Sequence, residues 1–378
     1  MPRPPISIIG AGISGLTLSR CLQRRKVPFV LYERDTSEQI SKRHNYAITI
    51  SPRSRELLIS DAGLDANALN GTFVDPSPSS GEGQKSVRVN RRKLESALRQ
   101  GIQGMRYGHK LQDVKLPTSG SDANATVLFE NGEQTPDGST IIGADGAHSA
   151  VRKAIAPEAD FTIHSFPAIN GKRRLQRSLY EAQIAPYVSD LNHVLEHKSG
   201  CSIFGISIDD VKDETVDLSY TYSRPRRPAG EADALYTPDR PNSGAKDIPP
   251  QFYEEIATLH PSLPAPFDLI FESDTLKKDR LLSWLMRSVS VPREASEAAA
   301  GQGMVLVGEA VHLTPILGSY GANEGIEDAV ALAGILERGT EVGLFVGERV
   351  AEWERWVGEG VGRLEAMHGV GEGGGARL

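Results

Sequence analysis

The clearest pattern of hydrophobic and polar positions lies at the start of the chain. An apolar run at 6–9 leads into three glycines, Gly10, Gly12 and Gly15, and an amphipathic stretch follows them to residue 22. This order predicts a buried strand, a tight turn and a helix. Gly10 permits the turn, Gly12 lets the backbone approach a pyrophosphate, and Gly15 lets the helix pack close to the strand.

A second apolar run extends this unit. Residues 29–32 are followed directly by Glu33. This acid lies about 20 residues beyond the glycine turn, where a carboxylate can bind the ribose hydroxyls of an adenosine. The phosphates would then lie at the positive end of the first helix. Glycines alone are weak evidence because any strand-to-helix turn favours them, but this context predicts a dinucleotide-binding unit.

The next alternating stretch, 45–50, has the period of a strand. Pro52 then opens a helix at 53–62 that Gly63 closes. Arg43 precedes the strand and allows two interpretations. It lies near the nucleotide if this strand runs beside the first one, and otherwise it is a solvated loop residue.

A long surface loop is predicted at 69–85, which is rich in Gly, Ser, Pro and Asp. The strand 87–90 then leads into a helix at 91–100, with Asn90 as its N-cap. Arg91 therefore begins a helix near the end of a strand.

A second nucleotide-type segment comes in the middle of the chain. Short strands at 105–107 and 126–129, with an Asn131-Gly132 turn, are typical of an antiparallel addition to such a domain. The strand 140–142 then ends in a glycine-rich turn around Asp145-Gly146. An acid and glycines at this place again suit close contact with a nucleotide.

The third nucleotide-type segment comes late in the chain. A strand at 304–307 enters a bend that runs from Gly308 to Gly321, and a helix at 324–336 follows with Asn323 as its N-cap. His312 has no second type of metal ligand at helical spacing, so we interpret it as structural and expect no metal site.

The composition changes between 155 and 302, with more aromatic residues, prolines and strand-like runs. Candidate strands are 201–208 and 216–222, and prolines open a helix at 251–259. The proline-rich stretch 224–250 is too long for a plain connector, so it is either a mobile lid or an excursion at the edge of a second domain.

Charge and cysteine content exclude several classes of protein. The net charge of −7 and pI of about 5.8 do not favour binding to nucleic acid or to an anionic membrane surface. Two distant cysteines indicate neither a disulfide framework nor a cysteine-based metal site. With no apolar stretch long enough to span a bilayer and no signal peptide before the first strand, we expect a cytoplasmic protein.

Together, the three glycine turns resemble the motifs of the class A flavoprotein monooxygenases, the para-hydroxybenzoate hydroxylase-like family, and the resemblance extends over most of the chain. It implies an α/β fold in which a Rossmann-like FAD-binding domain, 1–154 and 303–340, carries a mixed-sheet substrate domain, 155–302. Residues 341–378 would form a C-terminal helix and a flexible tail.

The resemblance also implies roles for individual residues. Arg91 matches an arginine that contacts the flavin nucleotide, and Arg43 loosely matches an arginine near the isoalloxazine. The FAD contacts expected from the glycine turns and the resemblance are Gly10, Gly12, Ile13, Ser14, Gly15, Glu33, Arg34, Arg43, Arg91, Asp145, Gly146, Gly308, Glu309, Pro315, Gly318, Gly321, Ala322 and Asn323.

The third motif departs from the family pattern. Glu309 replaces the usual Asp and keeps a carboxylate for the ribityl chain, Ile316 replaces a second proline, and Ser319-Tyr320-Gly321 replaces a Gly-Gln-Gly-like turn. In the family, the backbone near that proline lies along the substrate side of the flavin ring. These departures therefore concern the oxygen chemistry more than FAD binding.

The implied function is that of an FAD-dependent monooxygenase. NAD(P)H, docking transiently, would reduce FAD, and the reduced flavin would take up O₂ as a C4a-hydroperoxide. One oxygen atom would then hydroxylate or epoxidise a hydrophobic, aromatic or polyketide-like small molecule. No catalytic base is identified: Arg43, Tyr220, Tyr222 and His193 are candidates, although alternating tyrosines on a strand are more often packing residues.

Two other functions stay open at this point. One is a redox-neutral or dehydrogenating flavoenzyme on the same scaffold, and the other is a non-catalytic flavin-containing binding protein. The sequence does not identify the substrate, the choice between NADH and NADPH, or whether the protein is a monomer or a homodimer.

Overall fold

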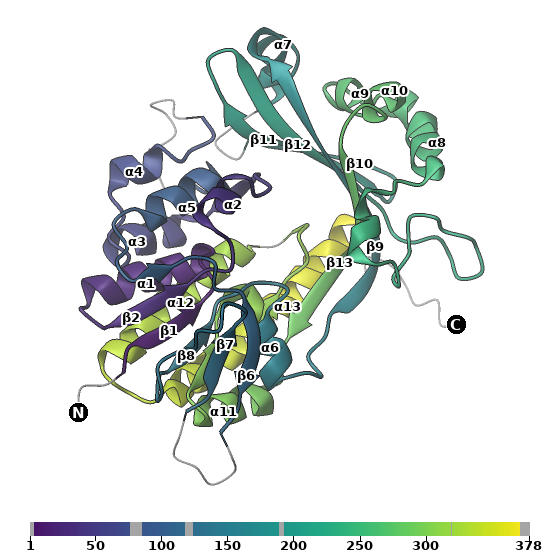
Figure 1. Cartoon of the computed structure of the whole chain (residues 1–378). Coiled ribbons are helices and arrows are strands. Elements are labelled where there is room, and N and C mark those ends of the chain that lie inside the picture. The colour runs from purple at the N-terminus through teal and green to yellow at the C-terminus, as the bar shows by residue number, and fades with distance from the viewer. Residues whose placement is uncertain (1–3, 76–84, 118–123, 189–192, 319, 371–378) are drawn as a thin grey trace.

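The computed structural model describes residues 4–75, 85–117, 124–188, 193–318 and 320–370. The expected tail at 371–378 and Ser319 of the third glycine turn lie outside the described residues. The chain forms two bodies (Figure 1), which we call the nucleotide body and the sheet body. The start and end of the chain build the nucleotide body around a parallel sheet, and the middle builds the sheet body.

A five-stranded parallel sheet organises the nucleotide body, in the order β14-β8-β1-β2-β5. The strands are β1 (Ile6–Ile9), β2 (Phe29–Tyr32), β5 (Met105–Arg106), β8 (Ile141–Gly143) and β14 (Met304–Leu306). Every residue of β1, β8 and β14 is buried, as expected for parallel strands that are covered on both faces.

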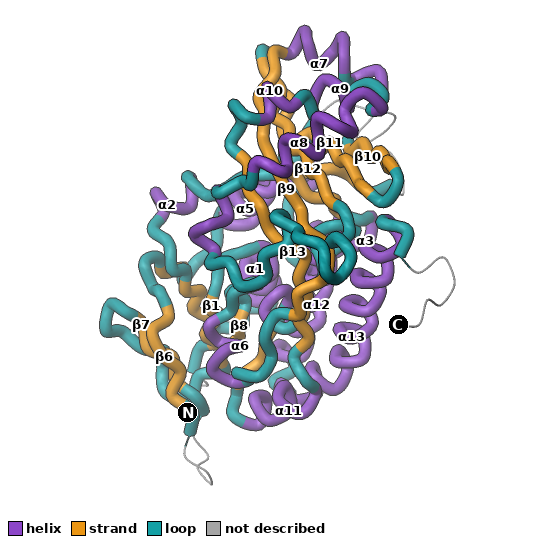
Figure 2. Tube along the Cα trace, turned by 90° about the vertical axis from the view of Figure 1, so that its right-hand side faces the viewer, coloured by secondary structure: helices purple, strands orange, loops and turns teal. Residues whose placement is uncertain are grey.

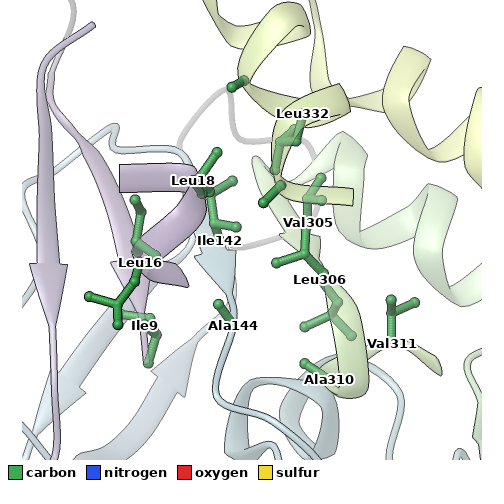
Figure 3. Packing of buried hydrophobic residues seen from close by; sticks show 14 of the residues in the cluster. Ile9, Leu16, Leu18, Ile142, Ala144, Val305, Leu306, Ala310, Val311 and Leu332 are labelled. Atoms are coloured by element: carbon green, nitrogen blue, oxygen red, sulfur yellow. The ribbon is translucent and has the colours of Figure 1, made fainter. Parts of the chain in front are cut away.

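Helices cover this sheet and continue its core. They are α1 (Ile13–Arg24), α2 (Ser37–Ser41), α3 (Pro52–Ser60), α4 (Ala66–Asn70), α5 (Arg91–Arg99), α6 (Ala150–Ile155), α11 (Arg293–Gly301), α12 (Gly321–Glu337) and α13 (Val342–Met367). Leu18 of α1, Ile142 of β8, Val305 of β14 and Leu332 of α12 gather in one buried cluster (Figure 3). The glycine turns are therefore mounted on a rigid support.

Two small antiparallel sheets flank the nucleotide body, β3 (Ala47–Ile50) with β4 (Val87–Asn90), and β6 (Leu111–Lys115) with β7 (Thr126–Phe129). The Asn90 side chain caps α5 as the sequence predicts.

The sheet body contains a six-stranded antiparallel sheet in the order β10-β11-β12-β9-β13-β15. The strands are β9 (Thr162–Gln176), β10 (Val194–Ser199), β11 (Ser202–Val211), β12 (Thr215–Ser223), β13 (Leu281–Ser290) and β15 (His312–Leu313). In the view of Figure 2, β13 runs from this sheet toward α13, so the two bodies are joined by more than their connecting chain.

One face of this sheet packs against helices. They are α7 (Arg177–Gln183), α8 (Pro250–Leu259), α9 (Phe267–Ile270) and α10 (Ser273–Leu276), with single 3₁₀ turns at Ala185–Tyr187, Asn242–Lys246 and His260–Ser262. Buried Phe204, Phe252 and Phe271 lie in the apolar cluster between sheet and helices. The opposite face carries polar side chains, which matter for the site.

Two expectations about strands are wrong. Residues 105–107 are not part of an antiparallel addition, because β5 pairs in parallel with β2 and extends the main sheet. The antiparallel partner of β7 is β6, which has no hydrophobic pattern since a single one of its residues is buried.

The packing of α11 and β15 favours a different domain boundary from the composition change at residue 302. The helix α11 packs against α13 and β14, and its Ala299 and Ala300 belong to the core of the nucleotide body. In the other direction, β15 joins the antiparallel sheet. We therefore propose a boundary near Val291, which also lies in the nucleotide core.

The proline-rich stretch 224–250 is fixed to the edge of the sheet body. The Arg224 guanidinium is buried and pairs with Asp233 at 2.8 Å and Glu255 at 2.6 Å, and Arg240 donates to the Ser283 carbonyl oxygen. These contacts favour an excursion over a mobile lid.

Within the described residues, no helix has both the length and the hydropathy to cross a membrane. Cys21 is buried in α1, Cys201 is exposed beside β11, and the two form no disulfide with each other.

A close cross-strand contact gives a test of the sheet body. Gly171 of β9 pairs with Tyr220 of β12, and a Cβ added at Gly171 would lie 2.2 Å from the tyrosine ring. Gly171→Ala should therefore lower the free energy of unfolding by about 1–3 kcal/mol, measured by urea denaturation. Gly205→Ala on β11 is the control, because the Cβ added there would approach no atom closer than 3.8 Å. Equal stability of the two variants would contradict this packing.

Candidate functional site

The first glycine turn is close-packed on one side and open on the other. Gly10 has φ +107°, and a Cβ there would lie 2.5 Å from the Ala144 carbonyl oxygen, whereas a Cβ at Gly15 would lie 2.0 Å from the Gly10 carbonyl oxygen. A Cβ at Gly12 would meet no atom within 4 Å. The helix α1 has no side-chain N-cap and no acid in its first turn, so its positive end at Gly12 is available to a pyrophosphate.

Glu33 is buried at the end of β2 and held against this turn. Its Oε2 accepts from the Ala11 N–H at 3.1 Å, and its Oε1 accepts from the Asp35 N–H and from Arg43 Nη2. Arg43 also donates to Asp35 at 2.7 Å, so it lies beside Glu33 at the end of β2, and its expected place near the isoalloxazine stays a prediction. Arg34 is exposed next to Asp35.

The middle turn is a helix cap as well as a glycine turn. The Asp145 carboxylate accepts from the Ser149 hydroxyl at 2.5 Å and from the backbone N–H groups of Ala150 and Val151. It therefore orders the start of α6. Gly146 has φ +77°, and a Cβ there would meet no atom within 4 Å, so the backbone beside it is open to a ligand.

Arg152 joins the middle and third segments. This fully buried side chain donates to the carbonyl oxygens of Ala147 at 2.6 Å, Ala310 at 3.1 Å and Glu309 at 3.3 Å. The three carbonyl dipoles stabilise its charge, and the two turns are thereby held in a fixed relation.

The first and third segments meet at Ser14. A Cβ at Gly308, where φ is +60°, would lie 2.6 Å from Ser14 Oγ, and one at Gly325 would lie 2.3 Å from it. Any side chain at either glycine would push α1 and α12 apart. The three glycine segments predicted from the sequence therefore converge on one place.

Asn323 has a different role from the expected N-cap. The helix α12 begins at Gly321, with Ala322 in its first turn, so Asn323 is already helical. Its side chain donates to the Thr49 carbonyl oxygen at 2.9 Å and accepts from the Ser51 N–H at 2.8 Å. Asn323 thus fixes the start of α12 to β3, and no side chain caps α12.

Glu309 and Arg91 lie on the same side of the site. Glu309 is exposed, its Oε1 lies near Gly321, and its carboxylate has no hydrogen bond or ion pair among the described residues. Arg91 pairs with Glu95 at 2.9 Å and lies 5.1 Å from the ring of Tyr46. Burial lowers the pKa of Arg91, but Tyr46, Glu95 and Glu309 outweigh burial and raise it, so the guanidinium stays charged.

The loop that departs from the family pattern is held by α13. Pro315 is buried, whereas Ile316 and Tyr320 are 64% and 49% exposed. Arg363 of α13 donates to the Gly318 carbonyl oxygen and lies 5.5 Å from the Tyr320 ring. Two large side chains therefore stand at the surface of the loop.

The tyrosines proposed as catalytic candidates lie in the core. Tyr220 and Tyr222 are 2% and 1% exposed on the helix-covered face, where their hydroxyls donate to Asp279 and Glu255, each at 2.6 Å. Burial raises the pKa of both phenols. His193 lies just before β10, and its carbonyl oxygen accepts from the Ile208 N–H. The structure brings neither tyrosine side chain to the glycine turns.

Sequence reasoning missed two charged residues between the bodies. Asp209 is buried and accepts from the Ala47 N–H at 2.9 Å and the Ser219 hydroxyl at 3.2 Å. Arg88 of β4 reaches β11. The polar positions that alternate with buried isoleucines in 202–211 were the available signal, but they do not say what lies opposite.

Comparison with known proteins gives a consistent result. The chain is 32% identical over 360 residues to the FAD-dependent monooxygenase adaC of Aspergillus niger, covering 87% of this chain and 84% of that protein. It is 32% identical over 366 residues to the FAD-dependent monooxygenase aptC of Emericella nidulans, covering 88% and 86%. HpxO of Klebsiella pneumoniae, solved with FAD and uric acid, shares the fold with a TM-score of 0.66 at 18% identity, covering 97% and 89%. No family model matches the chain.

The open side of the first turn gives a test of cofactor binding. Gly12 has φ −80°, which valine adopts, and its Cβ would meet no protein atom. Gly12→Val should keep the fold but weaken FAD by about tenfold or more, because the side chain would fill the space of the pyrophosphate. FAD retention and a fluorescence titration of the apo-protein measure this. Gly301→Val, also unobstructed, is the control, and unchanged FAD affinity of Gly12→Val would place the pyrophosphate elsewhere.

Glu324 gives a test of the pH dependence of stability. It is buried in α12 with Oε2 3.6 Å from His312 Nδ1, and neither atom has a hydrogen-bond partner among the described residues. Burial raises the pKa of Glu324 to about 7, with His312 acting against this and Asp328 adding to it. Since an unfolded glutamate has a pKa of about 4.3, the folded protein holds a proton between these values that the unfolded chain releases.

The stability of the wild type relative to Glu324→Gln should therefore fall as pH rises from about 4.5 to 7, by at most about 1.4 kcal/mol for each pH unit. Urea denaturation at several pH values measures the difference. Glu297→Gln, at an exposed glutamate paired with Arg293, should run parallel to the wild type. A parallel curve for Glu324→Gln would show that the carboxyl titrates normally.

Proposed function

Since this chain belongs to the family of FAD-dependent monooxygenases, we propose that it uses NAD(P)H and O₂ to hydroxylate or epoxidise a hydrophobic, aromatic or polyketide-like small molecule. The observation that carries the proposal is the convergence of three glycine segments from distant parts of the chain on one place. A ligand as long as FAD would contact all three segments.

The residues present fit FAD. The turn at Gly12 with the uncapped start of α1 would hold the pyrophosphate, and Glu33 would bind the adenosine ribose. Near the other end, Glu309 has an unpartnered carboxylate that would accept a ribityl hydroxyl, and the charged Arg91 would bind the flavin nucleotide.

When bound, FAD supplies the redox chemistry, accepting a hydride from NAD(P)H and passing electrons to O₂, so that one oxygen atom enters the substrate and the other leaves as water. The chain supplies position. Asn323 fixes α12 to β3, and Arg152 fixes the third turn to the middle one. With Tyr220 and Tyr222 in the core, catalysis would depend on orienting the substrate against the cofactor.

The exposed Ile316 and Tyr320, where the family pattern has proline and glutamine, favour testing a dehydrogenating reaction as the alternative. The two functions differ in the source of the oxygen atom. A monooxygenase places an atom from O₂ in the product, and a dehydrogenase does not.

The test reduces the holoenzyme with NADPH or NADH without oxygen and then admits ¹⁸O₂, across a panel of phenols and polyketides. We expect at least one compound to accelerate flavin reduction and to gain a single ¹⁸O atom, seen by mass spectrometry. Gly12→Val should show neither effect. An oxidised product without ¹⁸O would establish the dehydrogenase, and tight binding of a compound that is recovered unchanged would establish a binding protein.

A further inference from the structure

A partly buried arginine between the two bodies has no anionic partner. Arg88 of β4 donates through Nη1 to the Thr49 hydroxyl at 2.9 Å and through Nη2 to the Ser207 hydroxyl at 2.7 Å. Its Nε is enclosed and unpaired. Among the described residues, no carboxylate oxygen lies within 4.0 Å of its guanidinium nitrogens.

This arrangement leaves the Arg88 charge without a carboxylate in direct contact, although Asp209 offsets part of it from a greater distance. Burial lowers the pKa of Arg88 to about 10, so the group is still charged at neutral pH. By contrast, the guanidinium of Arg224, a buried arginine of the sheet body, is paired with two carboxylates, those of Asp233 and Glu255. Arg88 has only two neutral hydroxyls, and an enclosed charge with such partners is costly until an anion reaches it.

Arg88 also lies next to the third glycine segment. Its partner Thr49 accepts, through its backbone carbonyl oxygen, from the side chain of Asn323 in the first turn of α12. One residue therefore separates Arg88 from the segment that would contact the flavin. On its other side, Ser207 belongs to the polar face of the antiparallel sheet.

The strand register shows which residues lie side by side on that face of the sheet, and we call each set of directly paired residues a row. Directly paired residues share a face of the sheet. The row that contains Ser207 continues across the sheet with Ser219 and Lys172. The next row is Gly205, Thr221, Asn170 and Leu282, and the third is Ile203, Ser223, Ala168 and Trp284.

The face thus changes from cationic at Arg88 and Lys172, through small and neutral side chains, to apolar at Trp284. Further positive charge lies at the first end: burial lowers the pKa of His44 to about 4, and Lys172 and Arg280 act in the same direction. The third row is covered in part by the end of α13, because Ser223 and Ala168 are fully buried and His368 Nε2 lies 3.1 Å from Ser223 Oγ. The open part of the face, with its cationic and its small neutral rows, fits a flat ring system with an acidic oxygen at one end.

Asp209 is a buried carboxylate near Arg88, and it contributes to the charge at this end of the face. Its carboxylate accepts from Ala47, Ser219 and Ser207, the last at 3.4 Å, and lies 3.8 Å from Lys172 Nζ. It therefore offsets Lys172 and part of the Arg88 charge, but the only hydrogen-bonded link between Asp209 and Arg88 in the part of the chain that the structure describes is the Ser207 hydroxyl.

Resting on the proposed function, we propose that Arg88 binds an anionic oxygen of the substrate, a carboxylate or an ionised enol or phenol, and so selects acidic aromatic molecules. Charge-assisted hydrogen bonds to its Nη atoms would supply the missing anionic partner. Arg88 would then be the residue that sets which end of the substrate enters between the bodies.

The experiment compares two probes of the same shape, 9,10-anthraquinone-2-carboxylate and 9,10-anthraquinone-2-carboxamide. Binding is followed by quenching of tryptophan fluorescence, with Trp284→Phe to identify the signal from the proposed face. The wild type should bind the carboxylate at least tenfold more tightly than the carboxamide. Arg88→Met and Arg88→Gln should reduce this ratio to about one without weakening FAD, and Arg88→Lys should restore part of it.

Arg174→Met is the matched control. Arg174 lies on the same face of β9 as Lys172, but it is paired with Asp217, so its loss removes equal charge and should leave the preference intact. A wild type that binds both probes equally, or does not bind the carboxylate, would overturn the inference. So would a preference that survives both neutral variants of Arg88, since a merely structural arginine would not distinguish the two probes.

Probe binding requires no turnover, so the experiment tests the anion site at Arg88 independently of the monooxygenase reaction. A tenfold preference that depends on Arg88, in a protein that does not transfer ¹⁸O, would refute the monooxygenase and leave the anion site. Transfer of ¹⁸O with no preference for the carboxylate would do the reverse.

Discussion

The buried carboxylate of Asp328 is the contact on which the late part of the chain depends. It accepts from the Gly308 N–H at 2.9 Å, His312 Nε2 at 2.8 Å, Trp353 Nε1 at 2.9 Å and Arg349 at 3.0 Å. Burial alone would raise its pKa, but His312 and Arg349 outweigh burial and lower it. One side chain thus sets the third glycine turn, α12 and α13 relative to one another, and through α13 it reaches the exposed loop at the cofactor site.

The part of the site that could be predicted from sequence is the part fixed by local geometry. Gly10 and Gly308 need positive φ, Gly15 and Gly325 need the absence of a Cβ, and such demands appear in sequence as glycines at set spacings. The sequence favours a structural His312 because a second type of metal ligand at helical spacing is missing, and the buried Asp328 carboxylate is its hydrogen-bond partner.

The part that could not be predicted depends on pairing between distant segments. The resemblance loosely matches Arg43 to an arginine near the flavin ring, and it does not predict the ion pairs of Arg43 with Glu33 and Asp35 at the end of β2. Asn323 has the sequence context of an N-cap, yet its amide pairs with the Thr49 carbonyl oxygen of β3 and with the N–H of Ser51, just beyond that strand. In both residues a tertiary hydrogen bond outweighed the local preference, and spacing along the chain carries no record of it.

The strand register of the sheet body decides what the site contains. Successive residues of β11 and β12 face opposite sides, so a slip by one residue would replace Ser207 and Ser219 by isoleucine and leucine. A bulge after Ile208 interrupts this alternation and leaves Asp209 unpaired in the ladder. Asp209 can then accept from Ala47 of the nucleotide body, as bulges often re-aim a side chain. This contact joins the two bodies and holds the Asp209 carboxylate against Ala47. Arg88 therefore donates to the hydroxyls of Thr49 and Ser207, and Asp209 acts on its charge from a greater distance.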